Sequence, residues 1–286
     1  MDPPKSIGTR YLLTTVTWPA DGAIYVYNVS GEVIARLSCE FLRKGRITAF
    51  SYVLEACKAV VNEDGHLHEV PDGTIPSHNG MLSYSPQVID EGAAIRPLRA
   101  VYVRSDDPNA STTWTIGPKF KYKFKGPSPS LYASSDTMSH SSRSTEMQNS
   151  FRFELGCRDS CCLVTEDDQA GAAHILPQSR PKSYEEALGH DPGGLFDVSY
   201  GMFLRADMHK LWDQGCWALY PDPLEPTTLV VHAFVGSNVE QYHGKRIPRS
   251  RFHSKRRTPD VRLLAFHYRQ CLVKHVRGFS VFPQWP

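Results

Sequence analysis

Three residues of this 286-residue chain have the types and spacing of a hydrolytic metal site. His209 and Asp213 are four residues apart in a stretch of helical character, so their side chains would lie on one face of a helix. An imidazole and a carboxylate on adjacent turns can share one divalent cation. His174 precedes Ile-Leu-Pro at the expected end of a strand, where the proline forces the chain to leave. From there it could act on whatever the cation binds.

Each of these motifs also has a plain structural interpretation. A histidine and an aspartate at positions i and i+4 often form only a surface pair, worth roughly 0.2–0.5 kcal/mol. A single histidine before Ile-x-Pro is often structural. The chemical interpretation is favoured because three blocks occur in order, with a change from strand to helix within residues 200–213.

The three blocks resemble the HNH nuclease module, most closely the version found in many fungal proteins, where the third motif position is an aspartate. They are Arg-Asp-Ser-Cys-Cys-Leu-Val-Thr at 158–165, Ala-Ala-His-Ile-Leu-Pro at 172–177 and the helix through His209 and Asp213. The likeness covers roughly residues 155–220, and the expected helix near 258–277 also resembles the tail of such fungal proteins. It implies a ββα-metal fold and endonuclease activity on phosphodiester bonds.

The resemblance assigns a role to each site residue. His174 would be the general base that takes a proton from the attacking water, and its ordinary pKa of about 6.5 suits this role. His209 and Asp213 would hold a divalent metal, expected to be Mg²⁺, with Mn²⁺ or Zn²⁺ as alternatives. The metal would neutralise charge on the phosphate and on the leaving 3′ oxygen. The implied partner is nucleic acid, with DNA expected before RNA.

Two positions depart from the family pattern. Ala173 stands where many HNH proteins carry an acidic residue or a histidine as a further metal ligand, and Tyr200 stands where an asparagine usually precedes the glycine. Asp191 or Asp197 from the intervening loop could supply a ligand, or water and phosphate oxygens could complete a Mg²⁺ shell. The alternative function is a catalytically degenerate module that binds nucleic acid or protein.

A basic segment follows the module. Residues 245–257 contain no acidic residue and seven basic ones, namely Lys245, Arg246, Arg249, Arg251, Lys255, Arg256 and Arg257. Such a run could contact a phosphate backbone or act as a nuclear-import signal, and a solvated loop is the plain alternative. Lysines also alternate with aromatic residues at 119–125, which predicts an edge strand and, less strongly, a nucleic-acid contact.

Composition predicts an intracellular globular protein, nuclear or cytoplasmic and not secreted. The chain is 41% hydrophobic and 22% charged, with a net charge of +2, and no apolar run reaches membrane-spanning length. The first residues lack secretory-signal character. Seven cysteines, an odd number, favour reduced thiols over a disulfide framework. A zinc site is the less favoured reading of one cluster, which comprises Cys157, Cys161, Cys162 and Cys216.

The patterns of apolar and polar residues along the chain predict an α+β protein in three parts. Residues 1–126 predict a β-rich α+β domain of unknown role, and residues 127–150 predict a serine-rich flexible linker. Residues 151–286 predict the HNH nuclease domain, closed by a long C-terminal helix. We expect Thr258 to cap that helix, Gly278 to end it and His267 to lie on its surface.

Apolar periodicity predicts the remaining elements. In the N-terminal part the pattern predicts one amphipathic helix through Ile47–Val61 and strands at 11–18, 23–29, 32–38 and 98–104. His66 and His68 fall in a stretch, 62–96, that we expect to be loop. In the C-terminal part the pattern predicts a short helix at 184–188 and strands at 217–220 and 229–235.

Overall fold

The computed structural model describes residues 18, 22–71, 81–115, 142–236, 238–253 and 257–276. The predicted strand at 11–18, apart from Trp18, lies outside these ranges. The lysine–aromatic alternation at 119–125 and most of the serine-rich segment also lie outside them. No helix in the described ranges is long and apolar enough to cross a membrane.

Four strands in the N-terminal part form one sheet. They are β1 (Ala23–Tyr27), β2 (Val33–Ser38), β3 (Gly65–Glu69) and β4 (Leu98–Arg104), in the order β2-β1-β4-β3. Apolar residues give β1 and β2 interrupted buried positions and give β4 a continuous buried run. β1 and β2 form an antiparallel hairpin, β4 runs parallel to β1, and β3 runs antiparallel to β4. Two helices contact β2, namely α2 (Cys39–Lys44) and α3 (Ser51–Val60). The strands predicted at 23–29, 32–38 and 98–104 and the amphipathic helix are confirmed.

Strand β3 corrects the prediction that His66 and His68 lie in a loop. Leu67 between them is buried while His66 is exposed, and the strand pairs with β4 over its whole length. A strand with a single buried apolar side chain shows no recognisable alternation of apolar and polar residues, so the sequence pattern does not predict it. The free edge of β4 supplies the pairing that creates it.

The C-terminal part contains two small sheets and the helices around them. The strands are β5 (Ala170–His174) and β6 (Gly201–Arg205), which pair antiparallel, and a second sheet in the order β7-β8-β9, comprising Trp217–Asp222, Glu225–Ala233 and Arg246–Ile247. The helices are α4 (Ser142–Asp159), α5 (Pro181–Leu188), α6 (Ala206–Asp213) and α7 (Val261–His275), with 3-10 turns η1 (Val198–Tyr200), η2 (Glu240–Tyr242) and η3 (Arg249–Arg251). The chain is therefore α+β, and β5, β6 and α6 have the predicted strand–strand–helix order.

Helix α4 extends into the segment that the sequence predicts to be a linker. Residues 142–149 are helical, whereas 127–141 lie outside the described residues. The buried face belongs to the second half of the helix and contains Phe151, Leu155 and Arg158. The first two turns are polar and carry no apolar periodicity, so the composition indicates a linker there.

Helix α7 begins later than predicted. Asp260, not Thr258, caps it and accepts a backbone N–H of the first turn. The Thr258 hydroxyl instead accepts from Arg249 at 2.7 Å, and this tertiary contact decides between two good capping residues. The prediction that His267 lies on the surface is also wrong. Its ring is buried and stacks on Trp212, with ring centroids 3.7 Å apart.

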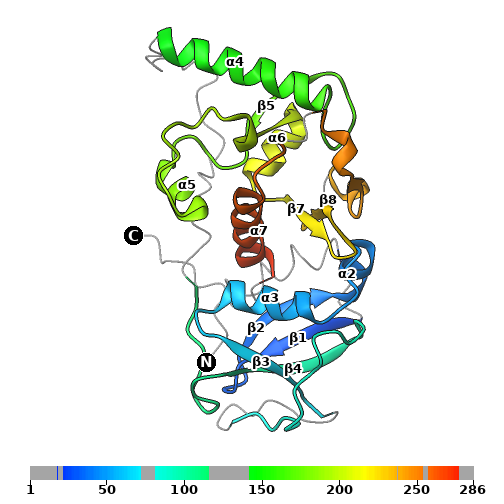
Figure 1. Cartoon of the computed structure of the whole chain (residues 1–286). Helices are drawn as coiled ribbons and strands as arrows, with labels where there is room; N and C mark the ends of the chain where they lie inside the picture. The colour runs from blue at the N-terminus through cyan, green and yellow to red at the C-terminus, as the bar shows by residue number, and fades with distance from the viewer. Residues whose placement is uncertain are drawn as a thin grey trace, which may run out of the picture.

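One hydrophobic core joins the N-terminal and C-terminal parts. Figure 1 shows the four-stranded sheet at one end of the molecule, α4 at the other and α7 between them. Helix α7 packs against α3, α5 and β7. Tyr52 of α3 and Tyr268 of α7 share a hydrogen bond of 2.5 Å, and Trp18 donates to the carbonyl of Ala233 at 3.0 Å. The C-terminal unit therefore rests on the N-terminal sheet and its helices through buried contacts.

Candidate functional site

The hairpin of β5 and β6 fixes the backbone of His174. This residue ends β5 and lies opposite Gly201 of β6. The preceding residue, Ala173, is fully buried in the core, and neighbouring strand residues point to opposite faces, so the His174 side chain lies on the other face of the hairpin. The ladder continues one residue further, where the Ile175 N–H donates to the carbonyl of Tyr200 at 2.8 Å. The base candidate is thus held by regular pairing on both sides.

The imidazole of His174 has a defined tautomer. Its Nε2 lies 3.0 Å from the carbonyl oxygen of Leu195, and a carbonyl only accepts, so Nε2 carries the hydrogen. In the neutral ring Nδ1 is then unprotonated and free to accept a proton. The ring stacks on Phe151 at 4.5 Å and meets the edge of Phe196 at 5.7 Å. One backbone carbonyl and two aromatic rings therefore set the orientation of the imidazole.

The surroundings of His174 favour its neutral form. Burial lowers the pKa of His174 below the ordinary 6.5, the hydrogen bond to Leu195 opposes this, and the His209 imidazole lowers it further. The net direction is downward, so His174 holds no charge at neutral pH. A neutral imidazole with a free Nδ1 is the state that a general base requires.

Helix α6 places His209 and Asp213 on its partly exposed face. Met208 and Trp212 are buried on an adjacent side of the helix, about 100° around its axis, and this apolar face anchors the helix. His209 Nε2 and Asp213 Oδ2 are 3.4 Å apart, and their side chains are 37% and 55% exposed. Desolvation raises the pKa of the Asp213 carboxyl although part of the side chain is exposed, and the His209 imidazole opposes this shift. Gly215, with φ of 58°, lies just beyond the helix end, as expected.

The donor pair fits a divalent cation. Two ligands that each lie about 2.0–2.1 Å from one cation are separated by roughly 3 Å, close to the 3.4 Å between Nε2 of His209 and Oδ2 of Asp213. Among the described residues, no group of three or more His, Cys, Asp or Glu side chains could hold a metal. The pair would therefore supply two ligands, and solvent and substrate oxygens would supply the others.

The loop carboxylates do not join this pair. Asp197 accepts from the backbone N–H and the hydroxyl of Ser199 and so caps η1, while Asp191 accepts the Gly193 N–H in a local turn. Tyr200 is also committed to the fold, since its side chain is largely buried and its ring packs against Tyr184. The structure explains Tyr200 as a packing residue.

The cysteine cluster contains free thiols. Cys162 and Cys216 are buried, whereas Cys161 is partly exposed and Cys157 is exposed. Among the described residues, these cysteines belong to no group of three or more side chains that could hold a metal. Cys161 has a partner of its own, because Arg251 donates to its Sγ at 2.7 Å.

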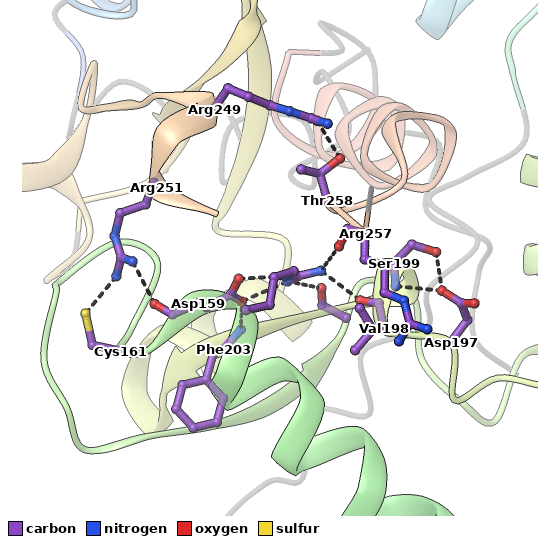
Figure 2. Close-up of polar contacts among 12 residues, drawn as sticks. Asp159, Cys161, Asp197, Val198, Ser199, Phe203, Arg249, Arg251, Arg257 and Thr258 are labelled. Carbon is purple, nitrogen blue, oxygen red and sulfur yellow. Dashed lines mark hydrogen bonds and ion pairs between the residues drawn. The ribbon is translucent and has the colours of Figure 1, made fainter. Parts of the chain in front are cut away.

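The basic segment contacts the protein itself. Lys245 pairs with Glu166 at 2.6 Å, and Arg246 pairs with Asp222 at 3.0 Å. Arg257 pairs with Glu154 of α4, although 61% of the arginine side chain stays exposed. Arg249 donates to Thr258 and Arg251 to the Asp159 carbonyl, as Figure 2 shows. Lys255 and Arg256 lie outside the described residues.

A buried ion pair that the sequence did not assign lies beside the hairpin (Figure 2). Arg158 and Asp159 at the end of α4 are 2% and 0% exposed, and two parallel hydrogen bonds of 2.6 and 2.8 Å join them. The other N–H groups of Arg158 donate to the carbonyls of Val198, Gly201 and Arg257. The block at 158–165 marks these residues, but only the fold shows that they join α4, η1, β6 and the basic segment.

Residues 161–220 match the family model described as HNH endonuclease. This stretch contains β5, η1, β6 and α6, and with them His174, His209 and Asp213. The chain therefore carries an HNH endonuclease family domain within its α+β fold. Such a domain suggests a nuclease-type function and implies nucleic-acid binding. No curated protein and no solved structure matches the chain.

Proposed function

We propose that this protein is a divalent-metal-dependent endonuclease that hydrolyses phosphodiester bonds, in DNA before RNA. The observation that supports it best is the state of His174. Its Nε2 is engaged by the Leu195 carbonyl, its Nδ1 is left free, and its pKa is lowered so that the ring stays neutral.

In this proposal each of the three site residues has one task. His174 accepts a proton from the attacking water at Nδ1, while the Leu195 carbonyl keeps the ring in that tautomer. His209 and Asp213 would hold the divalent cation, expected to be Mg²⁺ with Mn²⁺ or Zn²⁺ as alternatives. Such a cation neutralises negative charge on a phosphate and on a departing 3′ oxygen.

A catalytically degenerate module is the second candidate, and two observations favour it. Ala173, at the position of a further ligand in many HNH proteins, points into the core, and Tyr200 packs against Tyr184. The candidate site of such a module would bind nucleic acid without cutting it. The two functions differ in one outcome, which is metal-dependent cleavage.

A plasmid-nicking assay separates them. We expect the full chain to nick DNA with Mg²⁺ or Mn²⁺ and not with EDTA. The variant His174→Ala should lose about two to four orders of magnitude of rate, the usual range for a general base, while retaining DNA binding. His190→Ala, which removes an exposed histidine, is the matched control. Binding without cleavage in the wild type would favour the degenerate module.

A binding measurement tests the metal pair separately. His209→Ala and Asp213→Ala should each weaken Mn²⁺ binding, followed by calorimetry. Both side chains are partly exposed, so each substitution should change the free energy of unfolding by less than about 1 kcal/mol. Glu40→Ala breaks another exposed i,i+4 pair, with Lys44, and should leave Mn²⁺ binding unchanged. Unaltered affinity in both site variants would exclude this pair as the metal site.

We also place the protein in a reducing compartment, the nucleus or the cytoplasm. All seven cysteines are free in the structure. An odd number of unpaired thiols is typical of intracellular proteins. The location of a tagged full-length chain in cells tests this assignment.

A further inference from the structure

Helix α4 supplies an aromatic ring that covers His174 from outside the matched stretch 161–220. Phe151 is 2% exposed, and its ring stacks on the imidazole with centroids 4.5 Å apart and planes 23° apart. Phe196 meets the edges of both rings, at 5.9 Å from Phe151 and 5.7 Å from His174. The imidazole thus has one face against α4 and one edge against the loop before η1.

Gly201 leaves the space that this ring requires. It lies opposite His174 in the hairpin, and a Cβ there would collide with Cζ of Phe151 and lie 2.9 Å from Cδ1 of Leu155. Its φ of −135° is ordinary extended backbone, so no left-handed conformation demands a glycine here. Close approach of α4, together with the Ala173 carbonyl oxygen at 3.0 Å, therefore explains a glycine at this position.

The ion pair at the end of α4 fixes the same approach. Arg158 is seven residues after Phe151 and therefore lies on the same face of the helix. It donates to the Gly201 carbonyl at 2.9 Å, and Asp159 accepts the N–H of Phe203 at 2.9 Å. Helix α4 is consequently attached to β6 by the guanidinium and carboxylate at one point and by Phe151 two turns earlier.

We propose that Phe151 is a positioning residue for the general-base candidate His174, so that α4 contributes to the nuclease site. The stacked ring restricts rotation of the imidazole, keeps Nε2 on the Leu195 carbonyl and keeps Nδ1 available to water. This role rests on the proposed function. Phe151 itself does not contact the reacting atoms, so its removal should lower kcat and leave KM nearly unchanged. Displacement of a reacting group by about 1 Å can lower a rate about a hundredfold.

The test compares two phenylalanines of α4 in the full chain. Phe151→Leu removes the flat ring but keeps apolar volume, and Phe151→Met does the same with a different shape, in case the first variant folds poorly. Phe153→Leu is the matched control, because Phe153 is on the same helix and 72% exposed. We expect kcat to fall about tenfold to a hundredfold in both Phe151 variants, with KM within about twofold of the wild type, and no change in Phe153→Leu.

NMR of the His174 ring provides a readout that does not depend on activity. Its proton resonances, assigned with His174→Ala, should show a ring-current shift in the wild type and in Phe153→Leu, and lose it in both Phe151 variants. Nitrogen-15 spectra should show the Nε2–H tautomer in the wild type and a mixture in the Phe151 variants. Unchanged spectra, or wild-type kcat, in a folded Phe151 variant would overturn the proposal. If the wild type does not cut DNA but the spectra change as expected, the proposed function fails and the positioning of His174 by Phe151 stands.

Discussion

Trp212 of α6 donates its indole N–H to the carbonyl of Ile175, the residue directly after His174, at 3.0 Å. Both residues are buried, so this bond belongs to the core and not to a surface loop. It joins the helix that carries the metal pair to the strand that carries the base candidate. The relative position of the two halves of the site is therefore set by core packing.

The variant Trp212→Phe should distinguish the effect of this hydrogen bond on cleavage from its effect on the free energy of unfolding. The variant keeps an aromatic ring but leaves the Ile175 carbonyl without its donor, which should lower the free energy of unfolding by about 1–3 kcal/mol. We expect cleavage to fall further than this loss of folded protein explains, because α6 can shift relative to His174. Urea unfolding and the nicking assay are the two measurements.

Trp217→Phe is the matched control for this prediction. Trp217 donates an equivalent hydrogen bond of 3.0 Å to the carbonyl of Met208, which connects α6 to β7 and not to β5. The variant Trp217→Phe should lose about as much free energy of unfolding as Trp212→Phe but should lose less cleavage activity. Equal activity losses in the two variants would contradict a special role for the bond between Trp212 and Ile175.

The buried pair of Arg158 and Asp159 gives the second prediction. Asp159→Asn leaves a guanidinium at 2% exposure without its counter-charge, so we expect a loss of about 3–5 kcal/mol in the free energy of unfolding. Asp106→Asn breaks another two-bond pair, with Arg104, in which the aspartate is 63% exposed, and should destabilise the fold much less than Asp159→Asn does. Urea unfolding compares the two. Similar losses in both variants would show that the buried pair contributes no more than a surface pair.

Two buried histidines, His232 and His267, and the partly buried His243 predict acid sensitivity of the fold. Burial lowers the pKa of His232 and His267 to about 3 and that of His243 to about 4, from 6.5 when exposed. The unfolded chain therefore binds more protons than the folded chain below pH 6.5, and stability falls as the pH drops from there toward 4. Each histidine contributes a slope of up to about 1.4 kcal/mol per pH unit in this window.

Urea unfolding at pH 7.5, 6 and 5 measures this slope. His267→Phe keeps a ring to stack on Trp212 but removes one titrating group, so its stability should fall less steeply with acid than that of the wild type. His190→Ala, at an exposed position, should keep the wild-type slope. Stability that stays constant from pH 7.5 to 5 would contradict the prediction.

The sequence predicted the elements that carry a regular pattern. Strand β4 has the predicted bounds, Leu98–Arg104, because its run of apolar β-branched and aromatic residues is bounded by polar ones. The hairpin of β5 and β6 and the start of α6 were predictable because strand pattern changes to helix pattern within 200–213. The proximity of His209 and Asp213 follows from the helical repeat alone.

The contacts that orient His174 could not be predicted in this way. Phe151 is 23 positions before it, in a segment whose polar start indicates a linker, and Leu195 contributes a backbone carbonyl that any residue possesses. His267 was placed on the surface because it is polar, yet its Nε2 donates to the Trp212 carbonyl, which satisfies it in the core. Partners of this kind are brought together by tertiary packing, so the local sequence pattern does not predict them.

The last prediction concerns the basic segment, in which two arginines differ in their exposure and in their contacts. Arg257 is 61% exposed and could exchange Glu154 for a phosphate, whereas Arg251 is partly buried and donates to Asp159 and Cys161. Arg257→Ser should therefore lower the slope of log affinity against log salt on duplex DNA by about 0.9. Arg251→Ser should lower the free energy of unfolding and leave that slope nearly unchanged.

Titration of labelled duplex DNA at several salt concentrations measures both slopes, with Arg43→Ser on α2 as the control for loss of one exposed charge elsewhere. Because phosphate contacts carry no sequence information, Arg257→Ser should weaken binding to all sequences alike. If its slope is unchanged while nuclear accumulation of the protein is lost, the segment serves as an import signal. If neither changes, Arg257 pairs only with Glu154, and the segment is a loop that the protein uses to hold α4 in place.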